Sequence, residues 1–191
     1  TRIESGLTRM KNGFTRIKIC NMRKTKLSTT YAFIDASNII YGARAEGWFI
    51  DLKKLIIYLR SKFKVKKAFF YYGKDSGDYK KEQFLKKLES FGYILKVKEI
   101  KRFGAKSKAN CDVDLTMDML LLINSYTKAI VLTGDGDFAP LFRYLISNKK
   151  EIIIISSPKR TAKEIRSLVG DKHIDFGSLK YFLERKKRGR P

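Results

Sequence analysis

Short apolar runs alternate with amphipathic segments through the middle of the chain, over residues 30–178. The runs are short and bounded by turn-forming or charged residues, which is typical of buried strands. They predict strands at residues 31–35, 67–72, 93–100, 129–133 and 151–156. The segments between them repeat apolar residues at helical spacing, which predicts helices at residues 37–44, 52–63, 79–91, 112–124, 138–147 and 161–169.

The order of these elements predicts the fold class. Strands separated by helices imply βαβ units, and these build a parallel sheet covered on both faces. We therefore expect one α/β domain over residues 30–178, a three-layer α/β/α sandwich around a parallel sheet of about five strands. Asp51 is expected to cap the second helix, Gly92 to close the third, and residues 103–110 to form a polar loop.

Charge is the unusual part of the composition. The 191 residues are 43% hydrophobic, enough for a sizeable core, yet they carry 42 Lys and Arg against 19 Asp and Glu, a net charge of +23. So basic a protein attracts polyanions, which favours a nucleic-acid partner over a membrane surface or ribosome-like packing. No apolar run approaches the roughly 20 residues of a membrane span or the core of a signal peptide.

The two cysteines, Cys20 and Cys111, lie far apart in the sequence. A disulfide framework is therefore not expected, and a reducing, cytoplasmic location is the prediction.

Both ends of the chain are strongly basic. Residues 1–29 hold eight basic residues and one acid, and we expect a flexible arm. Residues 179–191 hold six basic residues and one acid, and we expect a basic tail. The tail ends in Arg-Gly-Arg-Pro, the core of an AT-hook for the minor groove, but a solvated tail is the preferred interpretation. Residues 30–178 retain a net charge of +11 and 17 of the 19 acids.

Six of these acids cluster in three short segments of the expected domain. Asp35, Asp135 and Asp137 follow the first and fourth expected strands, and Asp112, Asp114 and Asp118 begin or enter an apolar helix. Ligands of parallel sheets bind at the carboxyl ends of the strands. Carboxylates held together there need a cation, and oxygen donors favour Mg²⁺ or Mn²⁺ over zinc. Asp35, Asp112 and Asp137, taken singly, also fit helix caps, so the joint placement is what favours a metal site.

Helix phase restricts which acids share a site. Asp114 and Asp118 are four residues apart and share a helix face. Asp112 and Asp118 differ by about 120° around a helix. Asp112 therefore joins Asp118 only if it lies in a non-helical first turn.

Three segments carry a family resemblance. Phe33-Ile-Asp35-Ala-Ser-Asn38-Ile, Cys111-Asp112-Val-Asp-Leu115-Thr-Met-Asp118-Met119 and Leu132-Thr-Gly-Asp135-Gly-Asp137-Phe-Ala-Pro140-Leu follow one another in order. They resemble the signatures of NYN domains, the LabA-like branch of the PIN-like nuclease superfamily, over about residues 30–170. The resemblance implies a Rossmann-like sheet with its first and fourth strands adjacent at the centre, and metal-dependent ribonuclease activity.

The resemblance also implies roles for single residues. By position, Asp35, Asp112, Asp135 and Asp137 fall on the acidic, metal-binding cluster, Asn38 on its polar support, and Asp118 on the acid inside the helix. Asp114 falls on a variable position, and Ala109-Asn110 replaces the Lys-Gly that often precedes the second motif.

Lysines and arginines near the same edge are the expected RNA contacts. They follow strands or occupy loops, and the candidates are Lys74, Lys101, Arg102, Lys106, Lys108, Lys159 and Arg160. Tyr71 or Tyr72 would stack on bases if exposed. RNA is the expected partner, and a homodimer is an open alternative to a monomer.

Other classes are less compatible with the motifs. A haloacid-dehalogenase-type phosphatase needs a second Asp where Ser37 stands, and residues 112–123 lack the glycine and closing Glu of an EF-hand. Residues 73–77 lack the residue order of a P-loop. His173, the single histidine, is expected to be a surface or packing residue. The alternative that stays open is a nucleic-acid-binding adaptor without catalysis.

Overall fold

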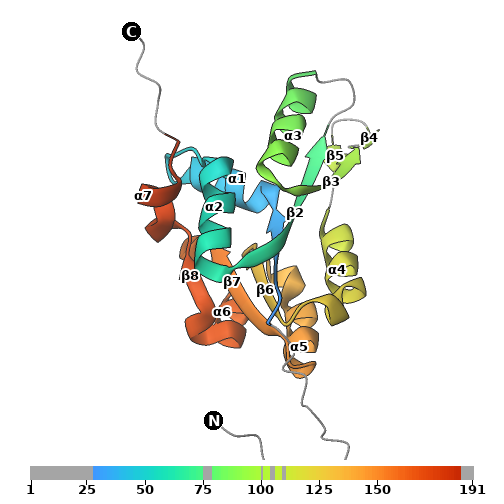
Figure 1. Ribbon diagram of the computed structural model, residues 1–191, viewed down its shortest axis with the longest axis vertical. Coiled ribbons are helices and arrows are strands. Elements are labelled where there is room, and N and C mark those ends of the chain that lie inside the picture. The colour runs from blue at the N-terminus through green and yellow to red at the C-terminus, as the bar shows by residue number, and fades with distance from the viewer. Residues whose placement is uncertain (1–27, 75–78, 100, 104–105, 109–110, 186–191) are drawn as a thin grey trace, which may run out of the picture.

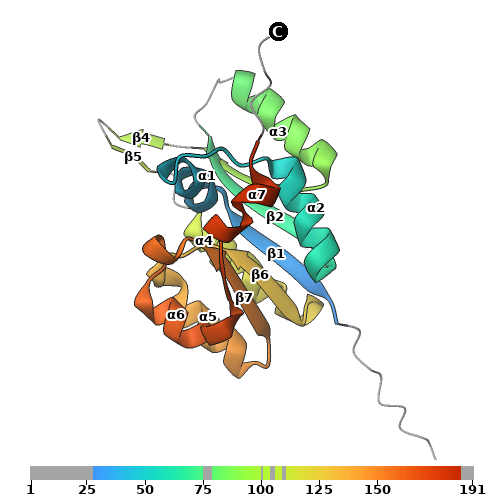
Figure 2. The ribbon, with the colours of Figure 1, turned by 90° about the vertical axis from the view of Figure 1, so that its left-hand side faces the viewer.

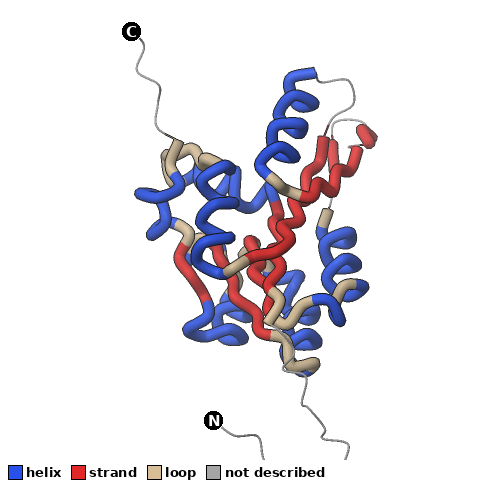
Figure 3. Tube along the Cα trace, viewed as in Figure 1, coloured by secondary structure: helices blue, strands red, loops and turns tan. Residues whose placement is uncertain are grey.

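The computed structural model describes residues 28–74, 79–99, 101–103, 106–108 and 111–185 (Figure 1). Nearly all of the expected basic arm, and residues 186–191 of the expected tail, lie outside this description. The described chain forms a parallel sheet between two helical layers, which confirms the predicted α/β/α class (Figure 3).

The central sheet has six parallel strands in the order β3-β2-β1-β6-β7-β8. The strands are β1 (Thr30–Asp35), β2 (Val65–Lys74), β3 (Ile94–Glu99), β6 (Lys128–Leu132), β7 (Glu151–Ser156) and β8 (His173–Asp175). β1 pairs with β6 at the centre, from Thr30 opposite Lys128 to Ile34 opposite Leu132. This adjacency of the first and fourth predicted strands is the one that the family resemblance implied.

The helices divide between the two faces of the sheet. They are α1 (Ala36–Ala45), α2 (Leu52–Phe63), α3 (Tyr79–Phe91), α4 (Asp112–Leu121), α5 (Ala139–Ser147), α6 (Lys163–Val169) and α7 (Lys180–Leu183). Buried residues of α1, α2, α3 and α7 form one core cluster, and those of α4, α5 and α6 form the other. Figure 2 shows α2 and α3 on one side of the sheet and α5 and α6 on the other.

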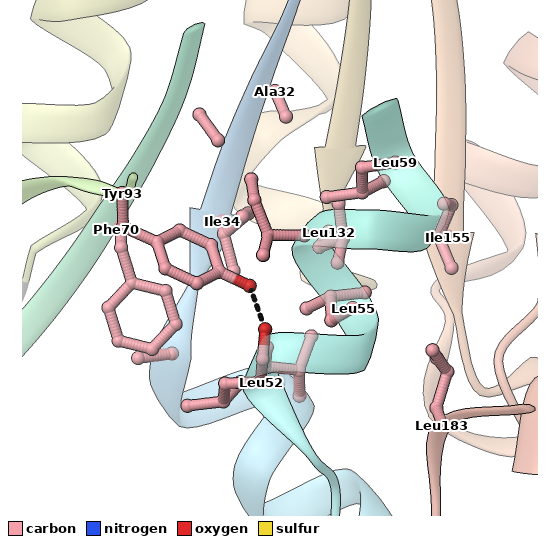
Figure 4. Close-up of a cluster of buried hydrophobic side chains, with 14 of the residues drawn as sticks. Ala32, Ile34, Leu52, Leu55, Leu59, Phe70, Tyr93, Leu132, Ile155 and Leu183 are labelled. Carbon is pink, nitrogen blue, oxygen red and sulfur yellow. Dashed lines mark hydrogen bonds between the residues drawn. The ribbon is translucent and has the colours of Figure 1, made fainter. Parts of the chain in front are cut away.

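Alternate residues along the central strands belong to the two core clusters. In β1, Ala32 and Ile34 belong to the first cluster, whereas Tyr31 and Phe33 belong to the second. A central strand is buried on both faces, so its sequence is almost wholly apolar. Figure 4 shows the first cluster, where the buried Tyr93 hydroxyl donates a hydrogen bond of 2.7 Å to the carbonyl oxygen of Leu52.

Local signals set the helix boundaries on the first face. The Asp51 side chain accepts hydrogen bonds from the backbone N–H groups of Lys53 and Lys54, at 2.9 and 3.2 Å, so it caps α2 as predicted. Gly92 has a φ of +92° and follows the last residue of α3. A side chain there would meet the Arg60 guanidinium, so both the backbone and the space favour glycine.

Three segments differ from the sequence prediction. Residues 103–110 were expected to be a loop, but the structure has an antiparallel hairpin of β4 (Lys101–Phe103) and β5 (Lys106–Lys108), which projects from the body of the fold (Figure 2). The strand β8 was not predicted, because three half-buried residues are too few to show a period. The helix expected over residues 112–124 ends at Leu121 and continues as a 3₁₀ turn, Ile123–Ser125.

The fold also extends past residue 178, where the basic tail was expected to begin. Leu179 and Leu183 are buried in the first core cluster. Ile50 forms a β-bridge with Glu184, and the N–H of Asp51 donates to the carbonyl oxygen of Leu183 at 2.7 Å. Residues 179–185 are therefore part of the packed domain. Among all the described helices, none is long and apolar enough to cross a membrane.

A truncation of one buried side chain tests this extension. Leu183→Ala should lower the free energy of unfolding by about 2–5 kcal/mol, because a fully buried leucine leaves a cavity. Tyr181→Ala is the matched control in the same short helix, since Tyr181 is 89% exposed, and should change stability by about 0.5 kcal/mol or less. Urea denaturation measures both, and equal effects would show that residues 179–185 are not packed.

Candidate acidic site

The first two acids lie at the carboxyl ends of the central strands. Asp35 is the last residue of β1 and caps α1, accepting a hydrogen bond of 3.2 Å from the N–H of Asn38. Asp135 follows β6 and caps the 3₁₀ turn η2 (Gly136–Phe138), accepting a bond of 3.0 Å from the N–H of Asp137. Because β1 and β6 are parallel neighbours, their two carboxylates come to the same edge of the sheet.

Two glycines hold the Asp135 turn against the loop that follows β7. A Cβ atom on Gly134 would lie 3.0 Å from the carbonyl oxygen of Arg160 and 3.1 Å from Thr161. On Gly136 it would lie 3.0 Å from the Cβ of Ala162. The N–H of Ala162 donates to the carbonyl oxygen of Gly134 at 3.0 Å. The position of Asp135 therefore depends on a close approach of the two segments, which a side chain at either glycine would disturb.

A hydroxyl network keeps that loop in place. Thr161 is buried, and its hydroxyl donates to the carbonyl oxygen of Ser157 at 2.6 Å. The Ser156 hydroxyl lies 2.8 Å from the Thr161 hydroxyl and 3.0 Å from Nε2 of His173. Burial lowers the pKa of His173, so a neutral ring is favoured. His173 therefore packs beside the loop and shares its hydrogen bonds.

Asp112 supplies the third carboxylate, from the first residue of α4. It acts on Asp35, whose pKa is raised from 3.8 to about 6. Burial is the largest cause, and the charges of Asp112 and Asp135 raise the pKa further, while the backbone N–H groups of Asn38 and Ser37 lower it. The charges of Asp112 and Asp135 thus both act on Asp35, and we call these three carboxylates the coupled group.

Asp118 lies in a different set of contacts. It accepts a hydrogen bond of 2.9 Å from the Tyr71 hydroxyl, and its Oδ2 forms an ion pair of 3.1 Å with Lys96. One turn earlier, Asp114 forms an ion pair of 2.8 Å with Lys98. Asp112 is already helical, so helix phase separates it from Asp118. Asp114 and Asp118 attach α4 to β2 and β3, and in doing so they position Asp112.

The other two predicted site residues stand beside the coupled group. Asn38 lies half-buried in the first turn of α1, and its N–H supports the Asp35 carboxylate. Asp137 is exposed in η2, and its N–H supports the Asp135 carboxylate. In both cases the contact that the structure records is a backbone contact, so the roles of these two side chains stay predictions.

The predicted RNA contacts are only partly described. Lys159 and Arg160 are exposed in the 3₁₀ turn η3 (Pro158–Arg160), and the Arg160 guanidinium donates to the carbonyl oxygen of Tyr41 at 3.3 Å. The backbone places the others at the end of β2 and in the hairpin, and their side chains lie outside the description: Lys74, Lys101, Arg102, Lys106 and Lys108. Tyr71 is 1% exposed, so it cannot stack on a base, and Tyr72 packs against Phe84.

The carboxylate oxygens of Asp35, Asp112 and Asp135 are the kind of ligand that magnesium and manganese prefer, but they do not converge on one point. Among the residues that the structure describes, no three Asp, Glu, His or Cys side chains are close enough to hold a metal ion as they stand. Asp35 and Asp135 each have an oxygen engaged by a backbone N–H. Carboxylates repel one another until a cation balances their charge. Binding would therefore require these side chains to move closer together.

Comparison with known proteins identifies the family of the chain. The family model of the NYN domain matches residues 29–177 of this chain. The chain belongs to the NYN domain family. It is 30% identical over 169 residues to the low amplitude and bright protein LabA of Synechococcus elongatus, which covers 83% of this chain and 89% of LabA. A crystal structure of a protein of unknown function from Vibrio parahaemolyticus has a TM-score of 0.68 at 22% identity, covering 84% of this chain and 99% of that one.

In this NYN domain, sequence reasoning missed the partners of Asp118. The alternation of Lys96 and Lys98 along β3, set against the spacing of Asp114 and Asp118 along α4, is the signal that could have found them. Matching these two spacings requires knowing that α4 lies beside β3, as Figure 1 shows.

The raised pKa of Asp35 predicts a pH-dependent stability change. Asp35 is harder to ionise in the folded protein than in the unfolded chain, so its ionisation lowers the free energy of unfolding. This loss of stability grows between pH 3.8 and about 6 and then stays constant. Asp35→Asn removes it and keeps a capping side chain. Near pH 7.5, in EDTA, the variant should be more stable than wild type, by up to about 3 kcal/mol.

Chemical denaturation at several pH values measures this difference, which should disappear below pH 4. Asp171→Asn is the control, because Asp171 is an exposed acid outside the coupled group. A less stable Asp35→Asn protein at pH 7.5 would contradict the electrostatic account.

Proposed function

We propose that this NYN protein is a divalent-metal-dependent ribonuclease whose site is the carboxylate group of Asp35, Asp112 and Asp135. The observation that carries the proposal is the coupling of these three acids. Separate elements bring them to one edge of the sheet, where burial, together with the charges of Asp112 and Asp135, raises the pKa of Asp35 to about 6 in a protein of net charge +23. Such a group is costly to keep without a function that uses it.

The three acids are the ligands we propose for Mg²⁺ or Mn²⁺, with Asp137 as a further ligand and Asn38 as polar support. When bound, the cation supplies an activated water and charge stabilisation for phosphodiester hydrolysis. To bind the cation, Asp35 would have to lose its proton, and its raised pKa keeps the carboxyl protonated up to a pH of about 6. Asp118 is a positioning residue in this proposal, since its contacts with Tyr71 and Lys96 hold α4 in place.

The basic residues would provide substrate attraction. Lys159 and Arg160 are exposed in the loop whose backbone packs against the Asp135 turn. A phosphate chain bound there would run next to the carboxylates. RNA is the proposed substrate because the chain belongs to the NYN family, whose resemblance to PIN-like nucleases implies ribonuclease activity.

An adaptor that binds RNA without cutting it is the second candidate. It is favoured by one observation, that no three candidate ligands within the described residues form a closed metal site. In that case the carboxylates would have no catalytic role, and the positive charge alone would account for binding.

Cleavage of labelled single-stranded RNA in Mg²⁺ or Mn²⁺ distinguishes these candidates. Wild type should cut the RNA, and EDTA should stop it. Asp35→Asn and Asp135→Asn should each slow cleavage by about 100-fold or more, because losing even a residue that only orients a metal ligand costs about 10- to 100-fold. Asp171→Asn should cleave at the wild-type rate.

Two other results would count against the proposal. Equal cleavage by wild type and both site variants would mean that the activity comes from a contaminant or another site. Tight RNA binding by wild type without cleavage in either metal would establish the adaptor.

Salt dependence tests the proposed RNA contacts separately from cleavage. Each phosphate contact on a single strand contributes about −0.7 to the slope of log K against log salt. The variant Lys159→Gln/Arg160→Gln should therefore bind RNA in EDTA with a slope smaller by about 1.4. Lys62→Gln/Lys66→Gln is the matched control, because it removes the same charge at the opposite edge of the sheet, where α2 ends and β2 begins. Equal slopes in the two variants would mean that only net charge matters.

A further inference from the structure

Helix α4 carries an apolar stripe on its outer surface. Val113, Met117 and Leu121 are 63%, 49% and 73% exposed. They are spaced by four residues, so they lie along one face of the helix. The opposite face already packs in the core, where Leu115 and Met119 are buried. A stripe of three large apolar residues on a well-formed helix is a candidate contact surface.

The same helix is acidic in a basic protein. Residues 111–125 contain Asp112, Asp114 and Asp118 and no lysine or arginine, although the chain has a net charge of +23. Asp114 and Asp118 already pair with Lys98 and Lys96, but a second copy of α4 packed on this stripe would still bring one set of three acids toward another. Charge therefore favours an occupant that is basic and apolar over a second copy.

One segment of the chain itself has this pattern. Its apolar residues are spaced by four, three, four and three positions, which is the spacing of a helical stripe: Ile3, Leu7, Met10, Phe14 and Ile17. Between and beside them stand five basic residues and one acid: Arg2, Arg9, Lys11, Arg16, Lys18 and Glu4. Gly6 and Gly13 weaken any helix that the segment forms alone. The segment lies outside the described residues, so this pattern is taken from its sequence alone.

The described chain begins next to the end of α4. The N–H of Thr29 donates to the Thr127 hydroxyl at 3.0 Å, and the N–H of Thr127 donates to the carbonyl oxygen of Thr29 at 2.9 Å. Thr127 closely follows α4, and the neighbouring Tyr126 donates its hydroxyl to the carbonyl oxygen of Met119 at 2.8 Å. Figure 1 shows β1 starting below α4.

The connecting length is sufficient. Residues 18–27 span up to about 33 Å when extended, whereas the ten residues of α4 are about 15 Å long. The segment can therefore reach any point of the stripe within its own chain.

From these observations we infer that residues 3–17, in place of the flexible arm expected from charge alone, dock on α4 as an amphipathic helix, with their apolar residues against Val113, Met117 and Leu121 and their basic residues near the α4 acids. The contact is intramolecular, and it covers the helix that also carries Asp112. The inference does not depend on the proposed nuclease activity.

Limited trypsin digestion of the full chain tests the docking. Trypsin cuts after Arg9, Lys11, Arg16 and Lys18, and docking should protect these bonds. Met117→Glu should increase the cutting rate at these sites by about fivefold or more, because a charge in the stripe opposes apolar contact. Asn124→Glu is the control, since it adds the same charge at an exposed position just after α4. It should leave the rate unchanged.

The reciprocal variant makes the test independent of α4 stability. Phe14→Glu should speed amide hydrogen exchange in α4 by about fivefold or more, whereas Thr15→Glu, one residue outside the apolar stripe, should not. Equal digestion of wild type and Met117→Glu would overturn the inference. Protection that disappears on dilution, together with a dimer mass by light scattering, would assign the stripe to a second copy and also overturn it.

Discussion

The parallel pairing of β1 with β6 is the constraint on which the candidate site depends. These two strands are far apart in the sequence, yet they lie side by side at the centre of the sheet and end at the same edge. The placement of the two acids follows from that pairing, because Asp35 ends β1 and caps α1, while Asp135 lies three residues after β6 and caps η2. Asp112 is added by α4, which packs on the same face as α5 and α6. If the β1–β6 register shifted by two residues, the two carboxylates would be displaced relative to each other by about 7 Å along the strands.

Electrostatics divides the acids of this NYN domain into two kinds. Asp114 and Asp118 meet lysines of β3 and serve as attachments between a helix and a sheet. At Asp35, burial is instead the main cost of ionisation, and the charges of Asp112 and Asp135 add to it. The first arrangement links α4 to β3 through partly exposed ion pairs. The second makes ionisation of Asp35 costly, and a bound cation would lower that cost. Asp112 and Asp118, six positions apart on α4, therefore have different roles because they face different elements.

Much of the fold was predictable from local patterns, and the contacts between elements were not. Helices α2 and α3 and the strand β7 begin and end where apolar spacing and the capping residue Asp51 predicted them. The motifs also led to Asp35 and Asp135, because carboxylates after apolar strands are out of character in the sequence. The pairing of Asp118 with Lys96 and Tyr71 was not predictable, since it depends on how α4 lies across β2 and β3. Strand β8 and the burial of Leu183 escaped prediction for the same reason, because tertiary packing and not local sequence orders them.

The long connection between β1 and β6 has a consequence for how the molecule comes into being. Thr29 and Thr127, which bond to each other beside these strands, are 98 residues apart in sequence. The entropy of closing so long a loop must be lost before the contacts between the two strands compensate for it, which slows folding compared with local helix formation. During synthesis, Asp35 leaves the ribosome well before Asp112 and Asp135 do. An incomplete chain therefore lacks the assembled carboxylate group, and the site comes into existence only when the central sheet closes.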